Sequence, residues 1–433
     1  MKSPEYIYQY FLKYPQISTD SRNTKHGAIF VALKGEHFDG NQYAEEALNK
    51  GAAYVIVDDP SVNKNDARYI LVHDALKTLQ ELAFMHRKNY PVPLIGITGS
   101  NGKTTTRNLT ARVLGNKYKV LSPKKNLNNH IGVPLTLLEL KDEHEIAVIE
   151  MGANHPGEID LLCKIAQPTH GIITNIGKAH LEGFGSYEGV FQTKTELYRY
   201  LENVKGTIFY NNDDPLLAKT ANNLNCEKFS YGTTNSPDFY IESYKTDPYV
   251  HLSVSPGKNK DHTIRSNLIG LYNLENMIAA LSIGSYFKIP MGKMKKTIQN
   301  YIPNQNRSQI IETKSNYIIL DAYNANPTSM KLAIENFSLQ EVKNKTLILG
   351  DMFELGKYAE EEHQQIINYA ENKNLNEIYL VGKHFSSINT GFHKTFHSTQ
   401  DFIDWLTKNP LSQKSILIKG SRGMTLEKLI EYL

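Results

Sequence analysis

The sequence predicts an α/β protein whose two or three domains are built on mostly parallel sheets. Short apolar segments alternate with helical patterns along nearly the whole chain, which is typical of such sheets. The length of 433 residues exceeds the roughly 250–300 residues that one core can serve. A glycine-rich turn at residues 96–106 follows the apolar run Pro93-Leu94-Ile95 and precedes a predicted helix. Together these observations predict several α/β domains, one of them with a phosphate-binding turn.

Residues 1–90 are the first predicted domain. Its expected elements are strands at 28–34 and 53–57 and helices near 43–50 and over 74–89. The segment Tyr90-Pro91-Val92-Pro93 then interrupts the chain, because proline lacks the backbone N–H that a helix or strand needs. We therefore expect the first domain boundary there.

Residues 91–310 are the second predicted domain, which begins with the glycine-rich turn. A helix is expected over 103–115, followed by strands at 118–122, 146–150, 170–174 and 206–210. Residues 238–270 predict several strands joined by turns, and a helix is expected from Asn273 to about Phe287. Because helical patterns separate most of the earlier strands, we expect a parallel sheet.

Residues 311–433 are the third predicted domain, because the alternation starts again near residue 310. Strands are expected at 317–321, 346–350, 378–382 and 415–419, and helices near 328–338, 359–373, 398–408 and 424–432. This pattern predicts a small doubly wound, Rossmann-like domain.

The composition is that of an ordinary globular protein. A net charge of +3 and the lack of a basic run give no reason to expect nucleic-acid binding. Cys163 and Cys226 lie in unrelated segments and form no metal or disulfide pattern. No apolar run approaches the ~18 residues of a membrane span, and the first residues lack the apolar core of a signal peptide. We expect a cytoplasmic protein without membrane insertion.

The turn at 96–106 reads Gly-Ile-Thr-Gly-Ser-Asn-Gly-Lys-Thr-Thr-Thr. Its glycines let the backbone wrap around phosphate, and the following helix adds the positive end of its dipole. The Lys103 ammonium would reach the β- and γ-phosphates, and the Thr104 hydroxyl would bind Mg²⁺. The usual pattern has a glycine where this chain has Ile97, so an ordinary turn before a helix is the alternative. We expect a bound nucleoside triphosphate, and an exposed Lys103 in the free protein.

Three more residues stand where a nucleotide enzyme would need them. Glu150 ends a predicted strand, where its carboxylate could hold Mg²⁺, although a solvated strand end is the alternative. His180 lies in a glycine-rich loop after another strand, where a lone histidine is more often structural. Lys194 is indistinguishable by composition from a surface lysine on a helix.

The chain resembles the Mur ligase family, the ATP-dependent amino-acid ligases of peptidoglycan assembly. The segments that carry this resemblance occur in the family's order along the whole chain. They are Asp20-Ser-Arg22 followed by GAIFVALKGEHFDGN, then GITGSNGKTTT, NLNNHIGVPLTLL, IEMGANHPGEI, TNIGKAHLEGFGS, LIGLYNLENMIAA, DAYNANPTSM, LGDMFELG and IKGSRGM. DAYNANPTSM, LGDMFELG and KGSRGM are typical of the member that adds D-alanyl-D-alanine to UDP-N-acetylmuramoyl-tripeptide.

The resemblance implies three domains: one that holds the UDP-sugar (1–90), a central P-loop ATPase (91–310) and a Rossmann-like C-terminal domain (311–433). It also implies two Mg²⁺ ions, with Thr104, Glu150, His180 and Lys194 at the metal sites. Lys194 is expected to be carbamylated, since a carbamate supplies the anionic oxygen ligands that a hard cation prefers.

The resemblance further assigns the contacts with ATP and with the peptide substrates. ATP is expected at Gly99, Ser100, Asn101, Gly102, Lys103, Thr104, Thr105, Asn276 (adenine), Arg307 and Asp321. The UDP-muramoyl group is expected at Ser21, Arg22, Asn128 and Asn129, and the peptides at Asn324 and Asn326. For these six residues turn chemistry is an equal alternative. Tyr272 stands where the family usually has a histidine, which leaves that contact to adenine open.

The implied reaction activates the tripeptide carboxylate as an acyl phosphate, which the dipeptide amine attacks, and it releases ADP and phosphate. The catalytic residues expected are Lys103, Glu150, His180, Lys194 and Arg307. The alternatives are another Mur or folylpolyglutamate-type ligase and a nucleotide-binding regulator without activity. We expect a monomer, and the third residue of the tripeptide, lysine or diaminopimelate, stays open.

Overall fold

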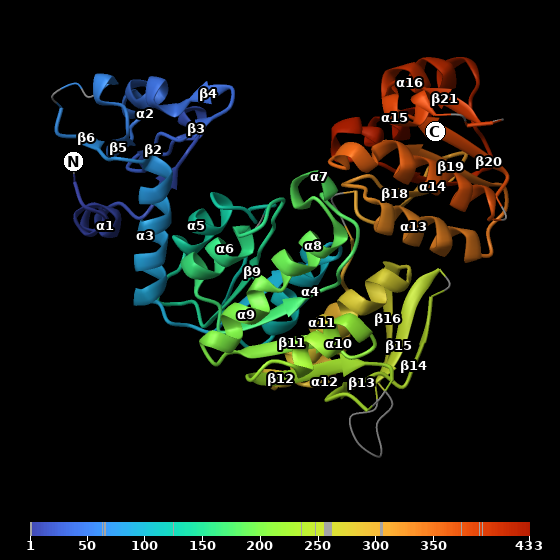
Figure 1. Cartoon of the computed structure of the whole chain (residues 1–433), viewed down its shortest axis with the longest axis horizontal. Helices are drawn as coiled ribbons and strands as arrows, with labels where there is room; N and C mark the ends of the chain where they lie inside the picture. The colour runs from blue at the N-terminus through green and yellow to red at the C-terminus, as the bar shows by residue number, and fades with distance from the viewer. Residues whose placement is uncertain are drawn as a thin grey trace.

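The computed structural model describes three α/β units in series (Figure 1). The residues described are 2–62, 64, 66–123, 125–234, 236–246, 248–254, 262–303, 306–373, 375–388, 390–391 and 393–433. The first and third units lie at opposite upper ends of Figure 1, with the central unit below and between them. The predicted fold class is confirmed. No helix in these ranges is long and apolar enough to cross a bilayer.

The first unit is a four-stranded parallel sheet with helices around it. The strand order is β1 (Ile17–Ser18), β2 (Ile29–Val31), β5 (Tyr54–Val57) and β6 (Tyr69–Leu71). A small hairpin joins β3 (Lys34–Gly35) to β4 (Phe38–Asp39), and the helices are α1 (Pro4–Lys13), α2 (Ala44–Asn49) and α3 (Ala75–Asn89). Buried Arg87, near the end of α3, donates to the carbonyl of Ala166, which ties this unit to the central one.

The central unit contains a seven-stranded parallel sheet. In spatial order the strands are β13 (Phe239–Tyr240), β12 (Glu227–Gly232), β11 (Thr207–Asn211), β10 (His170–Ile173), β7 (Leu94–Thr98), β9 (Ile146–Glu150) and β8 (Val120–Leu121). Its helices are α4 (Lys103–Leu114), α5 (Gly132–Leu137), α6 (Glu158–Ala166), α7 (Leu181–Phe184), α8 (Tyr187–Lys194), α9 (Glu196–Asn203), α10 (Pro215–Asn222), α11 (Leu271–Tyr286) and α12 (Met291–Gln299).

Successive side chains of the central strands pack on opposite faces of the sheet, as the two-residue period of a strand requires. Ile95 and Ile97 belong to the core that includes Met277 of α11, while Ala147 and Ile149 belong to the core on the other face. Both faces are therefore covered, and the functional groups are left to the carboxyl ends of the strands.

The expected strands within residues 238–270 are confirmed where the structure describes them. Apart from β13, they form an antiparallel sheet of β14 (Ser243–Lys245), β15 (Tyr249–Val254) and β16 (His262–Ile269). Residues 247 and 255–261, which also fall in the predicted segment, lie outside the described residues.

The third unit is a doubly wound sheet, as predicted. In spatial order its strands are β17 (Gln309–Glu312), β18 (Tyr317–Asp321), β22 (Ser415–Lys419), β19 (Lys345–Gly350), β20 (Glu377–Val381) and β21 (Lys394–Phe396), with only β17 antiparallel. Its helices are α13 (Pro327–Leu339), α14 (Ala359–Glu371), α15 (Lys383–Ser387) and α16 (Thr399–Lys408). Since β17 already pairs with β18, we propose a domain boundary just before Gln309, close to the expected one.

The helix predicted near 424–432 is wrong in type. Residues Leu426–Tyr432 form a 3₁₀ helix, which begins after Thr425 in a left-handed conformation (φ 51°). Leu426 and Leu429 are buried against the sheet. Their three-residue spacing matches the 3₁₀ repeat, which the helical pattern in the sequence does not distinguish from the α repeat.

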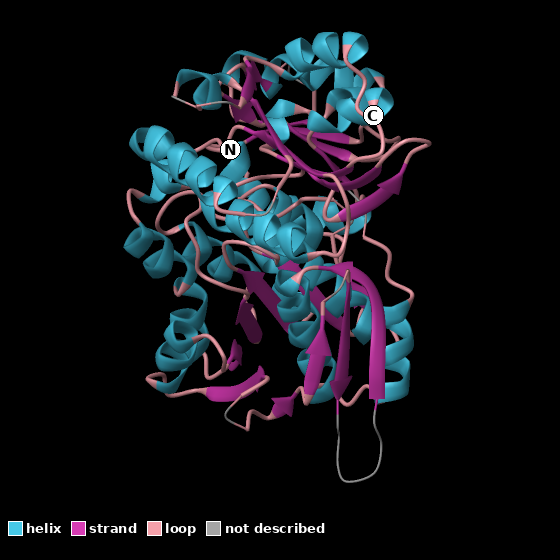
Figure 2. Cartoon of the chain, turned by 90° about the vertical axis from the view of Figure 1, so that its right-hand side faces the viewer, coloured by secondary structure: helices cyan, strands magenta, loops and turns pink. Residues whose placement is uncertain are grey.

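The central and third units contact each other directly. Asn326, at the start of α13, donates to the side chain of Asn101 at 2.8 Å, and Lys178 pairs with Glu362 of α14 at 2.5 Å. Figure 2 shows the third unit's sheet above the central helices. The carboxyl ends of β7 and β9 therefore face residues of a second domain.

Candidate active site

The glycine-rich turn joins the carboxyl end of β7 to the N-terminus of α4. Gly99 has φ 137° and Gly102 has φ 80°, conformations that L side chains rarely adopt. A Cβ on Gly102 would lie 2.2 Å from Oδ1 of Asn276, and one on Gly99 would lie 2.1 Å from Oγ1 of Thr174. Glycine is thus required at both positions, by conformation and by close packing.

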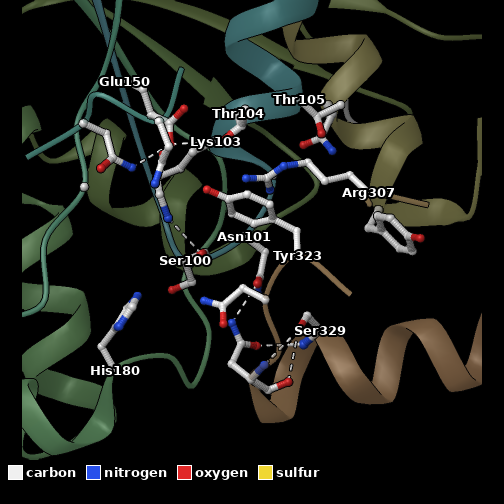
Figure 3. Close-up of a pocket in the computed structure, with 18 of the residues that line it drawn as sticks. Ser100, Asn101, Lys103, Thr104, Thr105, Glu150, His180, Arg307, Tyr323 and Ser329 are labelled. Atoms are coloured by element: carbon white, nitrogen blue, oxygen red, sulfur yellow. Dashed lines mark hydrogen bonds between the residues drawn. The ribbon is translucent and has the colours of Figure 1, made fainter. Parts of the chain in front are cut away.

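This turn forms one wall of a cavity of about 410 Å³ (Figure 3). Fifteen of the residues predicted for the site line it: Ser100, Asn101, Gly102, Lys103, Thr104, Thr105, Asn128, Asn129, Glu150, His180, Asn276, Arg307, Asp321, Asn324 and Asn326. They come from the central and third units, so the cavity lies between the two. Four predicted residues do not line it: Ser21, Arg22, Gly99 and Lys194.

Several lining residues were not singled out from the sequence. They include Asn126, His130, Asn154, Glu158, Asn273, Ser308, Tyr323, Ser329 and Lys419. Asn126, Tyr323 and Lys419 stand inside segments that carry the family resemblance, so a signal was present there. Ser308 lies outside those segments, and nothing in its sequence context distinguishes it.

Glu150 is buried at the end of β9, with a carboxylate that is only half used. Its Oε1 atom accepts hydrogen bonds from Thr104 at 3.1 Å and from Asn128 at 2.8 Å. Its Oε2 atom lies 3.5 Å from the Arg107 guanidinium but has no hydrogen bond to any described residue. A buried oxygen in this state is suited to binding a cation.

Lys103 is half-buried, so the expectation of an exposed side chain is wrong. Its ammonium turns back and donates to the carbonyls of Gly99 at 2.8 Å and Ser100 at 3.0 Å. Burial lowers the pKa of Lys103, Glu150 opposes this shift and Arg307 adds to it. The loop carbonyls thus hold the Lys103 ammonium at the place where the oxygens of a bound phosphate would compete for it.

Lys194 ends α8 and is 1% exposed, so its interpretation as a surface lysine is wrong. Its amine donates to the carbonyl of Ala153 at 3.2 Å and lies 5.0 Å from the centre of the Phe184 ring. Burial lowers its pKa well below the ordinary value, and the charge of Lys103 adds to this shift. A neutral amine is the form that can react with CO₂. Lys194 lies behind the wall of the cavity, to which Ala153 belongs.

His180 lines the cavity from the loop between β10 and α7, at the edge of the group drawn in Figure 3. Its backbone has φ 52°, in the left-handed region. Its Nδ1 atom faces the carboxylate of Glu354, from the third unit, at ion-pair distance but without hydrogen-bond geometry. This contact lowers the pKa of Glu354.

A cationic wall faces the turn from the junction of the central and third units. The Arg307 guanidinium lies 3.6 Å from the centre of the Tyr323 ring, and its buried Nε atom has no partner among the described residues (Figure 3). Arg422 approaches the same ring at 5.1 Å. Lys419 is paired with Asp321 at 2.6 Å. The positive charge of Arg307 is therefore free to face an anion.

A second cavity of about 340 Å³ adjoins the first and shares Asn101, Gly102, Tyr272, Asn276, Asp321 and Ser329 with it. Its remaining wall includes Asp213, Asp214 and Glu275. Burial raises the pKa of Glu275 to about 7, and the two aspartates add to this shift. Such acidic surroundings disfavour phosphate and favour an uncharged polar group such as a nucleoside.

Tyr272 and Asn276 stand between the two cavities. The Tyr272 hydroxyl lies 2.6 Å from that of Ser308, and burial raises the pKa of Tyr272. Asn276 accepts from Thr106 at 3.0 Å and donates to Asn273. These bonds fix the side chains at the junction of an acidic pocket and a phosphate-binding turn.

Several residues that the resemblance assigns to substrates have side chains that bond to neighbouring residues of their own turn or helix end. Asn326 caps α13 in a reciprocal pair with Ser329, and Asn129 accepts from two backbone N–H groups at the start of α5. Arg22 is paired with Asp20 in the first unit. The substrate roles of these residues stay proposals.

Within the described ranges, no three His, Cys, Asp or Glu side chains form a ready metal cage. Mg²⁺ does not need one, because it keeps several waters and binds one or two carboxylates together with phosphate. Thr104, Glu150 and His180 suit such a site. A phosphate-binding turn, an available carboxylate and a facing arginine together define a nucleotide-dependent enzyme of phosphoryl transfer.

The family comparison agrees with this class. Three family models match the chain: the Mur ligase family catalytic domain at 13–87, the Mur ligase middle domain at 97–284 and the Mur ligase glutamate ligase domain at 306–422. The chain belongs to the Mur ligase family, and it is an ATP-dependent, ADP-forming ligase.

The chain is similar to proteins named UDP-N-acetylmuramoyl-tripeptide–D-alanyl-D-alanine ligase. That of Bacillus subtilis is 37% identical over 96% of this chain and 92% of its own length, and that of Escherichia coli is 33% identical over 96% and 93%. The crystal structure of MurF from Acinetobacter baumannii has a TM-score of 0.86 at 31% identity, covering 96% of this chain and 92% of that one. MurF of Thermotoga maritima, solved with ADP, has a TM-score of 0.84 at 27% identity, covering 97% of both.

Proposed function

We propose that this enzyme joins D-alanyl-D-alanine to the free carboxylate of UDP-N-acetylmuramoyl-tripeptide, with ATP as the energy source. The observation that supports this most is the cavity of about 410 Å³ between two domains. The phosphate-binding turn and Glu150 line one side, and Arg307 and Asn324 line the other. ATP and the carboxylate it activates have to meet in such a place.

The chain's own groups supply charge and position for the phosphoryl transfer. The turn and the N-terminus of α4 bind the phosphates, and Lys103 exchanges its two carbonyl partners for phosphate oxygens. Arg307 faces the charge that develops as the γ-phosphoryl group moves to the carboxylate. The acyl phosphate then loses phosphate when the dipeptide amine attacks its carbonyl carbon.

Two Mg²⁺ ions would neutralise phosphate charge in this site. The hydroxyl of Thr104 and the carboxylate of Glu150 would hold one of them. His180 and a carbamate on Lys194 would hold the other. The half-used carboxylate of Glu150 and the low pKa of Lys194 support these assignments.

A third cavity, of about 520 Å³, fits the acceptor dipeptide. Among its lining residues, Lys383, His384, His397 and Lys428 are exposed and form no ion pair within the described part of the chain, and Phe353 and Met424 offer apolar surface. These groups suit a short apolar peptide with a free carboxylate. Phe353 lines this cavity and the next residue, Glu354, contacts His180 of the first, so consecutive residues of one segment reach both cavities.

A coupled assay tests the function. Release of ADP should require UDP-N-acetylmuramoyl-tripeptide and D-alanyl-D-alanine together, and tripeptides ending in lysine and in diaminopimelate should be compared. Turnover with glutamate, lysine or diaminopimelate as the acceptor would instead support another ligase of the family. Nucleotide binding without any turnover would support the inactive regulator. The expected compartment is the cytoplasm and the expected state a monomer, which gel filtration with light scattering would test.

A further inference from the structure

The loop that carries His180 is held from both domains, and on the central side Gly177 exchanges two hydrogen bonds with Ser100. Between residues 177 and 185 it makes four hydrogen bonds with the third unit. The backbone N–H of Lys178 donates to the hydroxyl oxygen of Thr328 at 3.0 Å, and the Lys178 ammonium donates to Glu362 at 2.5 Å. The N–H of Glu182 donates to the carbonyl of Glu354 at 3.1 Å, and the hydroxyl of Tyr358 donates to the carbonyl of Gly185 at 3.1 Å. The third unit therefore contacts this loop at both of its ends and in its middle.

Among these contacts, only that of Glu354 reaches the imidazole of His180 itself. Its carboxylate faces Nδ1, while no described residue bonds the other ring nitrogen, Nε2. Both residues have left-handed backbones, with φ 52° at His180 and φ 61° at Glu354. Such conformations are uncommon outside glycine and tend to be kept where function requires them.

A metal-binding histidine usually gives its second ring nitrogen to a carboxylate, which fixes the tautomer and the orientation of the ring. The pair of Glu354 and His180 has this arrangement, with the two partners on different domains. We propose that Glu354 is a positioning residue for His180, and that docking of the third domain thereby completes the metal site. This inference rests on the metal role proposed above for His180.

The alternative is that Glu354 only helps to hold the two domains together. Tyr358 then offers a matched control, because it contacts the same loop from the same segment but does not touch the imidazole. Glu354→Gln offers a second comparison, because an amide oxygen keeps a polar acceptor facing Nδ1 without the negative charge. Glu354→Ala removes the acceptor altogether.

The test measures binding of Mn²⁺ in the presence of ADP by electron paramagnetic resonance, alongside kcat and the KM for ATP. Loss of such a partner typically costs about 10–100-fold in metal affinity or activity. We expect this loss in Mn²⁺ affinity and in kcat for Glu354→Ala, partial recovery in Glu354→Gln, and values within about threefold of wild type in Tyr358→Phe. Small-angle scattering should give the same radius of gyration for all four proteins.

Three results would overturn the proposal. The first is unchanged Mn²⁺ affinity in Glu354→Ala. The second is an equal loss in Glu354→Ala and Tyr358→Phe, and the third is an expanded Glu354→Ala protein. Either of the last two would assign Glu354 to domain docking alone. Because the Mn²⁺ measurement uses neither peptide substrate, it stays decisive even if the proposed substrates are wrong.

Discussion

Gly102 and Gly157 have the same backbone conformation in two different surroundings. Alanine at each position therefore separates the cost of the left-handed conformation from the cost of a steric clash. Gly102 precedes α4 with φ 80° and ψ −10°, and Gly157 precedes α6 with φ 83° and ψ −11°. A Cβ on Gly157 meets nothing within 4 Å, whereas one on Gly102 lies 2.2 Å from Oδ1 of Asn276. Gly157→Ala should therefore show the conformational cost alone.

That conformational cost is about 1–2 kcal/mol for a left-handed alanine. Gly102→Ala must also displace the Asn276 amide, which is bonded to Thr106 and Asn273. Each lost bond costs about 0.5–1.5 kcal/mol. We therefore expect a loss of about 2–5 kcal/mol for Gly102→Ala and about 1–2 kcal/mol for Gly157→Ala.

Urea unfolding measures the stability of both variants, and titration calorimetry measures their binding of ATP. Gly102→Ala should also bind ATP more weakly, because the displaced amide lines the cavity. Gly157→Ala should bind ATP as the wild type does. Equal losses of stability in the two variants, within about 0.5 kcal/mol, would refute the close contact between Gly102 and Asn276.

Four further predictions concern the chemistry and the acid sensitivity of the protein. Lys103→Ala should abolish ligation and lower the unfolding midpoint only slightly, through the two lost bonds to the loop carbonyls. Activity within about tenfold of wild type would contradict the phosphate-binding role. Lys194→Ala should be nearly inactive and should recover part of its activity when small carboxylic acids are added. Near-normal turnover at saturating Mg²⁺ without added acid would exclude the carbamate. With ¹⁸O in the tripeptide carboxylate, one label should appear in inorganic phosphate, whereas label in AMP would contradict the acyl phosphate. Burial lowers the pKa of His170 to about 4, so the folded state keeps this ring neutral. The unfolded chain binds the proton first, near pH 6.5, and stability should fall as the pH drops from there to about 4. His170→Asn should lose less stability across that range, and an unchanged profile of unfolding free energy against pH would contradict the assignment.

The fold was largely predictable because its signals are local. Strands β9 and β19 contain short apolar runs, Ile146–Ile149 and Leu347–Leu349, and Pro91 and Pro93 mark the start of the central unit. The segment 424–432 was assigned the wrong helix type, because three- and four-residue spacings of leucine are hard to distinguish in so short a stretch.

The site was predictable where glycine geometry or a strand end carried it, as at Gly102 and Glu150. Burial of a charged group is different, because it depends on what the rest of the chain places around it. Nothing near Lys194 in the sequence indicates that Phe184 and Ala153 cover it. Contacts between domains, such as that of Glu354 with His180, also leave no signal in the sequence, because they join residues far apart in the chain.

The cavity walled by two domains has a consequence for molecules that block the enzyme. A compound that fills only the side formed by Gly102 and Glu150 gains nothing from bringing the domains together. One that spans from that side to Arg307 and Asn324 gains from both, and so shifts the population toward the docked form. A compound that spans both sides would hold the two domains together. It should dissociate slowly, because the domains must separate before it can leave.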